Sequence, residues 1–378
     1  MRQFDRDRLT RARRLRIFRR ILGLARLAVA IALLLVLYGV GVAPAIAAAF
    51  APTGAIGRTL LTIVVVLVAL WLVGLPLAVA GYRRERAEGL NLQPASSFAA
   101  DQLKALLVNV VLAGSASAAW YAIVRLPGST LIIILAAFAL ATAGVLIGPL
   151  LLRVFYRLET VDAALDERVR AVAQRAGIRV GAVRSWRVSE KATIANAVVL
   201  GLGPTKQIAI ADTLAREAPP EQVEAVVAHE LGHVVHGDTT LSVLVYGATL
   251  ALALLAVRAM LDIWTAEGSA DVATYPLLLA GVDLIAVVAS PAILAYSRSR
   301  EAAADAFAAR HARPEAMADA LVWIAQKNLS DPEPPRWEEI LFLSHPSVAA
   351  RLRALGAPPV SLSPERASPP PPPARSAR

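Results

Sequence analysis

Six long apolar stretches constrain the fold of this 378-residue chain more than any other feature. Five of them carry no charged side chain, and the sixth carries one acid, Asp283. A transmembrane helix needs about 20 consecutive, mainly apolar residues, so each stretch is long enough to cross a bilayer. Apolar residues make up 57% of the chain, which favours a membrane protein over a soluble or disordered one. The predicted spans are Leu27–Phe50, Leu60–Tyr82, Ala105–Val124, Leu126–Leu152, Thr239–Val257 and Val272–Ser297.

Basic residues exceed acidic ones by 10, and their placement predicts how the spans are oriented. Ten arginines precede the first span. If successive spans alternate in direction, Arg58, Arg125 and Arg258 lie outside, and the other 36 of the 39 basic residues face the cytoplasm. This asymmetry follows the positive-inside rule. We therefore expect the lipid bilayer as a partner and no nucleic acid, because no basic face is interleaved with aromatic residues.

The order of polar and apolar segments predicts the organisation of the chain. The predicted segments are an Arg-rich cytoplasmic N-terminus (1–26), four spans (27–152) with a cytoplasmic loop (83–104), a polar stretch (153–238), two further spans (239–297), a second polar stretch (298–355) and a tail (356–378). The tail holds five successive prolines, so we expect it to be disordered. Within the first polar stretch the pattern predicts an amphipathic helix at Thr160–Ala176, strands at Ala182–Val188, Ala195–Leu202 and Gln207–Ala211, and a turn at Gly201–Pro204.

A predicted helix at Glu221–Gly237 carries the motif His229-Glu230-Leu-Gly-His233. Its two histidines are four residues apart, so a helix places them on one face, where their ring nitrogens can hold one zinc ion. Glu230 lies beside them, where a carboxylate can act on water without binding the metal. Gly232 is a poor helix former, which indicates that a close neighbour requires a small residue there.

A third metal ligand is needed, because a catalytic zinc usually has three protein ligands. The chain has no cysteine, so the third ligand must be His, Asp or Glu. His236 is one candidate, although its position is rotated away from the face of the histidine pair. Glu301 is the favoured candidate, with Asp305 four residues further on a probable helix, where it would support a ligand imidazole.

These residues resemble the membrane zinc metallopeptidases of the type-1 CAAX prenyl protease and HtpX kind. The resemblance rests on the sequence HELGH at 229–233 and on S-R-x-x-E-x-x-x-D ending at Asp305. It extends to the loop Tyr82–Lys104, to Asn196-Ala197 followed by Gly201-Leu202-Gly203, and to His345-Pro346-Ser347 with Arg351. Four spans before the motif resemble the CAAX prenyl protease branch more than the HtpX branch.

The resemblance implies an integral-membrane zinc metalloendopeptidase that binds one Zn²⁺ per chain through His229, His233 and Glu301. Glu230 and His345 would be catalytic, as general base and oxyanion donor, with Asp305 supporting a ligand. Asn196, Ala197 and Arg351 would lie at the substrate side. The implied fold is mostly α, a polytopic membrane protein of about six spans with a cytoplasmic-side α+β zincin-like catalytic domain.

Several alternatives stay open from the sequence alone. One is a site-2-type intramembrane metalloprotease, and another is a non-enzymatic metal transporter or scaffold. The resemblance implies a peptide or protein substrate, with prenylated CAAX peptides and misfolded membrane proteins as the two candidate classes. The bias for Arg and Ala indicates a bacterial cell membrane, with both termini and the active site cytoplasmic. Asp283 would face a wet cavity or bond to a neighbouring helix.

Overall fold

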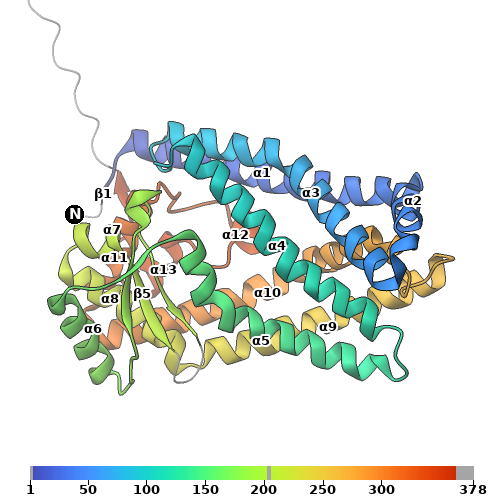
Figure 1. The fold of residues 1–378 in the computed structure, drawn as a ribbon. Helices are drawn as coiled ribbons and strands as arrows, with labels where there is room; N and C mark the ends of the chain where they lie inside the picture. The colour runs from blue at the N-terminus through green and yellow to red at the C-terminus, as the bar shows by residue number, and fades with distance from the viewer. Residues whose placement is uncertain (1–2, 202–205, 363–378) are drawn as a thin grey trace, which may run out of the picture.

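A computed structural model describes residues 3–201 and 206–362 of the chain (Figure 1). Within them, six helices are long and apolar enough to cross a membrane, which confirms the predicted number of spans. Each packs on the next and the last packs on the first, so the six form a closed ring. In ring order they are α1 (Arg6–Gly39), α3 (Gly54–Ala87), α4 (Ala95–Ile123), α5 (Ser129–Phe155), α9 (Asp238–Trp264) and α10 (Tyr275–His311).

The first span differs from its predicted bounds at both ends. Asp5 accepts a hydrogen bond from the backbone N–H of Asp7, so α1 begins in the arginine run rather than at Leu27. It ends at Gly39, and Gly41 adopts a positive φ of 77° before the short helix α2 (Val42–Ala49). A turn that needs the conformational freedom of glycine therefore divides the apolar stretch predicted as one helix.

The last span is one continuous helix that leaves the ring and enters the polar part of the molecule. α10 has 37 residues and is about 55 Å long at 1.5 Å per residue. Its first part lines the ring, and its last three turns carry Glu301 and Asp305, both buried. A membrane span and two candidate site residues thus share one helix.

A four-stranded sheet lies at the end of the molecule opposite α2 (Figure 1). Its strand order is β2-β3-β5-β4, in which β3 and β5 are parallel and the outer pairs are antiparallel. Three strands lie within predicted segments, whereas β2 was not predicted. The strands are β2 (Leu158–Thr160), β3 (Val183–Trp186), β4 (Ala197–Leu200) and β5 (Gln207–Ala211). The predicted turn at Gly201–Pro204 falls mostly on 202–204, outside the described residues.

Helix α8 (Pro220–Val235) is the centre of the polar part, between β4 on one side and α10 on the other. Pro220 opens the helix, where its missing N–H costs nothing. Its buried residues include most of the sequence from Val223 to Gly232, and they join one apolar core with the sheet. The surrounding helices are α6 (Ala163–Arg175), α7 (Asp212–Glu217), α11 (Pro314–Lys327), α12 (Arg336–Phe342) and α13 (Val348–Ala354), with 3-10 turns η1 (Ala51–Thr53), η2 (Val188–Glu190) and η4 (Val272–Thr274).

The two ends of the described chain are joined. The strand β1 (Gln3–Phe4) pairs in parallel with β6 (Ser361–Leu362), and Phe4 is buried in a small core with α11 and α13. Ser361 and Leu362 belong to the tail expected to be disordered, but they are paired because Phe4 anchors the facing strand. Residues 363–378 lie outside the described part.

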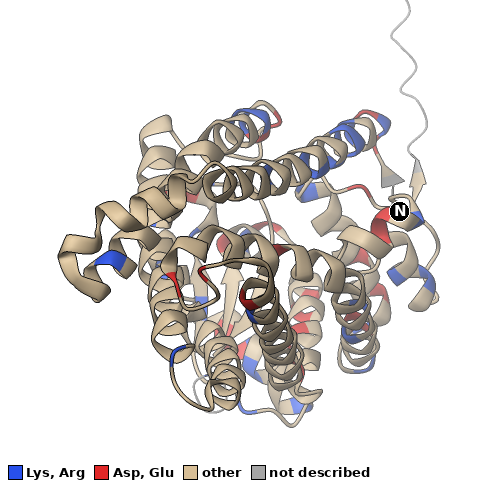
Figure 2. Ribbon diagram, turned by 90° about the vertical axis from the view of Figure 1, so that its right-hand side faces the viewer, with Lys and Arg blue, Asp and Glu red and all other residues tan. Residues whose placement is uncertain are grey.

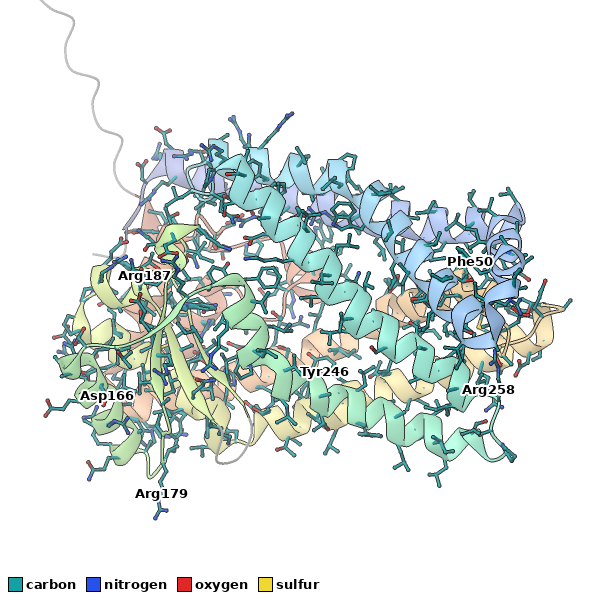
Figure 3. The ribbon with its side chains drawn as sticks, viewed as in Figure 1. Phe50, Asp166, Arg179, Arg187, Tyr246 and Arg258 are labelled. Carbon is teal, nitrogen blue, oxygen red and sulfur yellow. The ribbon has the colours of Figure 1, made fainter. Side chains whose placement is uncertain are left out.

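The three basic residues predicted to lie outside gather at the end away from the sheet. Arg58 pairs with Asp271 at 2.8 Å, Arg125 donates to the carbonyl of Ala270, and Arg258 donates to Ser129. Figure 3 labels Arg258 at this end and Arg187 at the sheet end. In Figure 2 several of the ribbon positions coloured for Lys and Arg lie on the same side of the molecule as the N-terminus.

Candidate metal and catalytic site

The candidate site forms where α8 crosses α10. At the crossing, Gly232 faces the backbone of Ala304: a Cβ added to Gly232 would lie 2.9 Å from the Cα of Ala304. Only glycine permits this approach, which the sequence predicted as a need for a small residue. The crossing brings His229 and His233 of α8 opposite Glu301 of α10.

Three side chains offer ligand atoms to one point. The Nε2 atoms of His229 and His233 are 3.3 Å apart. Nε2 of His229 lies 3.4 Å from Oε2 of Glu301, and Nε2 of His233 lies 3.4 Å from Oε1 of the same carboxylate. A tetrahedral zinc site with bonds of about 2.0–2.1 Å requires ligand atoms roughly 3.3–3.4 Å apart. The residues present therefore fit a metal ion of this kind, with a fourth position left for a non-protein ligand.

His229 is held from behind by Asp305. Its Nδ1 lies 2.9 Å from Oδ1 of Asp305, and Arg351 donates to both oxygens of that carboxylate at 2.7 and 2.6 Å. Burial alone would lower the pKa of His229, but Asp305 and Glu301 outweigh it and raise that pKa to about 9. A carboxylate in this place fixes the ring so that Nε2 faces the metal position.

His233 has the equivalent support from Asp238. Its Nδ1 donates to Oδ2 of Asp238 at 2.8 Å, and Arg300 donates to Oδ1 of the same carboxylate at 2.5 Å. Gly237, with a φ of 66°, turns the chain between α8 and α9 and places Asp238 beside the ring. Sequence reasoning did not assign Asp238 and Arg300; the Gly-Asp pair that follows the motif is the signal that could have found Asp238.

Glu230 belongs to α8, the helix that carries both histidines, and its side chain contacts the edge strand β4. Its Oε2 accepts a hydrogen bond from the backbone N–H of Val199 at 3.3 Å. Burial raises the pKa of Glu230 above its ordinary value, against the opposing charges of His229 and His233. A carboxyl group poised in this way suits proton transfer near neutral pH.

The remaining predicted site residues surround this centre. His345 lies on the loop between α12 and α13, with Nδ1 2.8 Å from Oε2 of Glu301 and 61% of its side chain exposed. Asn196 is exposed at the start of β4, and its side-chain oxygen accepts from the N–H of Ala197. Arg351 reaches the site through Asp305, and its Nη2 is 3.8 Å from Glu301.

Two other histidines and one acid are placed elsewhere. His236 ends α8, where its ring contacts Phe307 edge-on, and the metal cluster found among the described residues does not include it. His311 stacks on the other side of Phe307. Asp283 lies in the ring and lines a cavity of about 370 Å³ with Arg26 and Asn109.

Comparison with protein families gives two matches. Residues 159–358 match peptidase family M48, and residues 1–150 match the CAAX prenyl protease N-terminal domain, described as five membrane helices. In that region the described structure has four helices long enough to span, together with the short α2.

Relatives come from bacteria and plants. An uncharacterized metalloprotease, YhfN, of Bacillus subtilis is 26% identical over 75% of this chain and 69% of its own. Protease HtpX of Acinetobacter baylyi is 28% identical over 51% of this chain and 71% of its own. A CAAX prenyl protease 1 homolog of Arabidopsis thaliana is 29% identical over 72% of this chain and 66% of its own. Among solved structures, S. mikatae Ste24p has the same fold, with a TM-score of 0.79, 21% identity and coverage of 93% and 89%.

Proposed function

The chain belongs to peptidase family M48 and is a membrane metallopeptidase, and from that premise we propose how its residues divide the work. We propose that His229, His233 and Glu301 bind one zinc ion. The proposal rests chiefly on one observation: the two Nε2 atoms lie 3.3 Å apart, and each lies 3.4 Å from one carboxylate oxygen of Glu301, His229 from Oε2 and His233 from Oε1. The family assignment also favours this reading over a metal transporter and over a site-2-type protease.

Peptide hydrolysis at this site would depend on the bound metal ion and on the side chains of Glu230 and His345. A bound zinc ion would supply a Lewis acid that polarises the scissile carbonyl and activates water. Glu230 would take the proton of the attacking water and pass it to the leaving amine. Because its Oε2 accepts from Val199, and no hydrogen bond to Oε1 is found among the described residues, Oε1 would accept that proton. His345, the exposed imidazole over Glu301, would donate to the developing oxyanion.

The free edge of β4 would hold the substrate in extended form. Within residues 3–201 and 206–362, β4 pairs with β5 on one side and with no strand on the other. The N–H groups of Ala197 and Val199 contact the side chains of Asn196 and Glu230 in place of a neighbouring strand. A peptide added along this edge would therefore pass directly beside Glu230.

We propose that the site lies on the cytoplasmic side of a bacterial cell membrane. The sheet and the Arg-rich half of α1 lie at one end of the helix ring, whereas Arg58, Arg125 and Arg258 lie at the other. We propose unstructured peptide segments, including those of damaged membrane proteins, as substrates. The edge strand would bind a substrate through backbone hydrogen bonds, which recognise an extended chain and do not depend on a particular side chain.

The test is the substitution Glu230→Gln in the full-length, detergent-purified protein. We expect it to retain about one zinc ion per chain and to cleave an unstructured peptide about 10²–10⁴-fold more slowly, since general-base catalysis contributes that much. Glu224→Gln is the matched control, because Glu224 lies on the same helix and its ion pair within the described part of the chain is with Arg175, at 3.7 Å, which lies outside the site. Cleavage by Glu230→Gln at the parental rate would disprove the assignment.

The same variant identifies the substrate class. Glu230→Gln should retain bound substrate, which mass spectrometry of the captured peptides would identify. Prenylated and unprenylated forms of one peptide, compared with the active protein, separate the two classes. A strict requirement for the prenyl group would contradict the proposal of general unstructured peptides.

A further inference from the structure

We propose that Arg16 and Arg20 of α1 are positioning residues that hold α12 and, through it, the imidazole of His345 over the active site. The inference rests on the catalytic role of His345 given above. It assigns to the arginine run a task beyond orienting the first span.

His345 depends on its neighbours for its place. It lies in a loop with 61% of its side chain exposed, and its Nδ1 contacts Oε2 of Glu301 at 2.8 Å, so the segments on either side of the loop also determine its position. On the C-terminal side, α13 is held by Arg351, which binds Asp305 with two hydrogen bonds. On the N-terminal side the loop follows α12 directly, so the position of α12 decides where His345 points.

Glu338 joins α12 to α1. Its side chain is only 6% exposed, and each of its two oxygens pairs with a different arginine, Arg16 and Arg20. Burial alone would raise the pKa of Glu338, but these two guanidinium groups hold it below its usual range. A buried carboxylate with two cationic partners is strongly fixed, because removing them would leave an uncompensated buried charge.

Two further contacts extend this junction. Arg16 also donates to Asp331, whose side chain is 1% exposed, at 3.0 Å between Nε and Oδ2. The guanidinium carbon of Arg20 lies 4.9 Å from the ring centre of Trp337, in cation-π contact. The two arginines therefore contact α12 at Trp337 and Glu338, and the segment before it at Asp331.

The α12 helix is also tied to the helix that carries Glu301. Arg298, one turn before Glu301 on α10, donates to the carbonyls of Glu339 and Leu343, each at 2.8 Å. Among the described residues, three helices (α1, α10 and α13) thus hold the segment around His345, and α1 lies outside the catalytic motifs.

The first half of α1 is rigid enough to serve as an anchor. Ala12 and Leu15 are fully buried against Leu90 and Leu329, and Phe4 is buried at the β1–β6 pair. This part of the helix is therefore packed onto the polar domain, with the two arginines directed at α12.

The experiment compares two double substitutions in the full-length, zinc-loaded protein. Arg16→Gln with Arg20→Gln should lower kcat about 10–100-fold, since a displacement of about 1 Å in a catalytic group costs that much. We expect KM and zinc content to stay within twofold of the parent. Arg8→Gln with Arg14→Gln is the control: it removes the same charge from the same helix, and neither arginine forms an ion pair with a described residue. The control should keep the parental kcat.

A double-mutant cycle with His345→Ala separates positioning from general stabilisation. If the arginines act through His345, then Arg16→Gln with Arg20→Gln costs nothing further in the His345→Ala background. An equal fold loss in both backgrounds, or parallel losses of zinc and kcat, would overturn the proposal. Should the double variant not accumulate, Arg20→Gln alone carries the same comparison.

The two proposals fail in distinguishable ways. If His345→Ala kept the parental kcat, the catalytic role of His345 would be wrong and the positioning role with it. If His345→Ala lowered kcat and the arginine variant did not, the positioning role alone would be wrong.

Discussion

Each candidate ligand histidine contacts a carboxylate through Nδ1, and each of these carboxylates accepts hydrogen bonds from an arginine. Asp305 and Arg351 stand behind His229, while Asp238 and Arg300 stand behind His233. A carboxylate behind an imidazole keeps the proton on Nδ1 and makes Nε2 a stronger ligand. The arginine neutralises the carboxylate so that it can stay buried without drawing the ring away from the metal position.

Removal of either carboxylate should weaken metal binding. Asp305→Asn or Asp238→Asn is expected to lower zinc affinity about 10–100-fold, as is usual for such supporting groups. Titration against a zinc-buffering chelator measures it. Asp166→Asn is the control, because Asp166 pairs with Arg170 on the exposed face of α6. An unchanged affinity in both site variants would contradict this role.

Zinc affinity should rise with pH. In the metal-free protein the pKa of His229 is raised from 6.5 to about 9, so at pH 7 the ring carries a proton that zinc must displace. Raising the pH from 7 towards 9 removes that competition, and affinity should increase by up to about tenfold per pH unit before it levels off. Proton release in weakly buffered solution at pH 7 measures the same event. Affinity that falls over this range would reverse the assignment.

At the scale of single residues, spacing alone predicted the histidine pair and Glu230, because a helix has a fixed period. The partnership of Asp238 with His233 was not predicted, since it depends on the turn at Gly237 rather than on a helical repeat. The contact of Arg351 with Asp305 likewise joins residues 46 positions apart, a pairing that only the folded chain shows.

At the scale of elements, the crossing of α8 and α10 is set by one missing side chain. Gly232→Ala would place a methyl group 2.9 Å from the Cα of Ala304, where backbone must shift. We expect a loss of stability of about 1–3 kcal/mol together with reduced zinc content, because the shift separates the histidines from Glu301.

Thermal unfolding and metal analysis of purified Gly232→Ala provide the measurement. The control is Gly23→Ala in α1, where an added Cβ meets no atom within 4 Å. It should keep the parental zinc content and gain slightly in helix propensity. Full zinc occupancy in Gly232→Ala would show that the crossing tolerates a wider gap.

Apolar length predicted the number of spans well, because the bilayer requires it. Their bounds were predicted less well. The arginines of α1 are good helix formers and extend it far beyond its apolar part, while Gly41 ends the first stretch early. The short strand β2 has too few residues for a pattern of alternation to stand out.

At the scale of the whole molecule, the proposed orientation can be read by labelling. The chain has no cysteine, so a single introduced cysteine is an unambiguous reporter. A membrane-impermeant maleimide added to intact cells should label Ala51→Cys, at the end away from the sheet, and should not label Glu167→Cys on α6. Both positions are exposed. The opposite pattern would reverse the orientation.

Sequence patterns could not predict the closed ring or the pairing of β1 with β6. Periodicity reports which face of a helix is apolar, but not which neighbour covers it. The pairing of β1 with β6 brings together residues at opposite ends of the chain, and each strand has only two residues. The arginine run was interpreted through its charge alone, whereas its buried face, with Ala12 and Leu15, packs on the polar domain.

Helix α10 runs from the membrane-spanning ring to the candidate ligand Glu301, with Pro291 inside it. The helix rises about 39 Å from Tyr275 to Glu301, so a tilt of about 5° would swing that carboxylate through roughly 3 Å. The imidazoles of His229 and His233 would move with Glu301, because Gly232 of α8 packs directly against Ala304 of α10. His345 follows α12, which is also bound to α1 through Glu338, so it would move less than Glu301. A change in bilayer thickness should therefore change kcat and leave the zinc affinity unchanged.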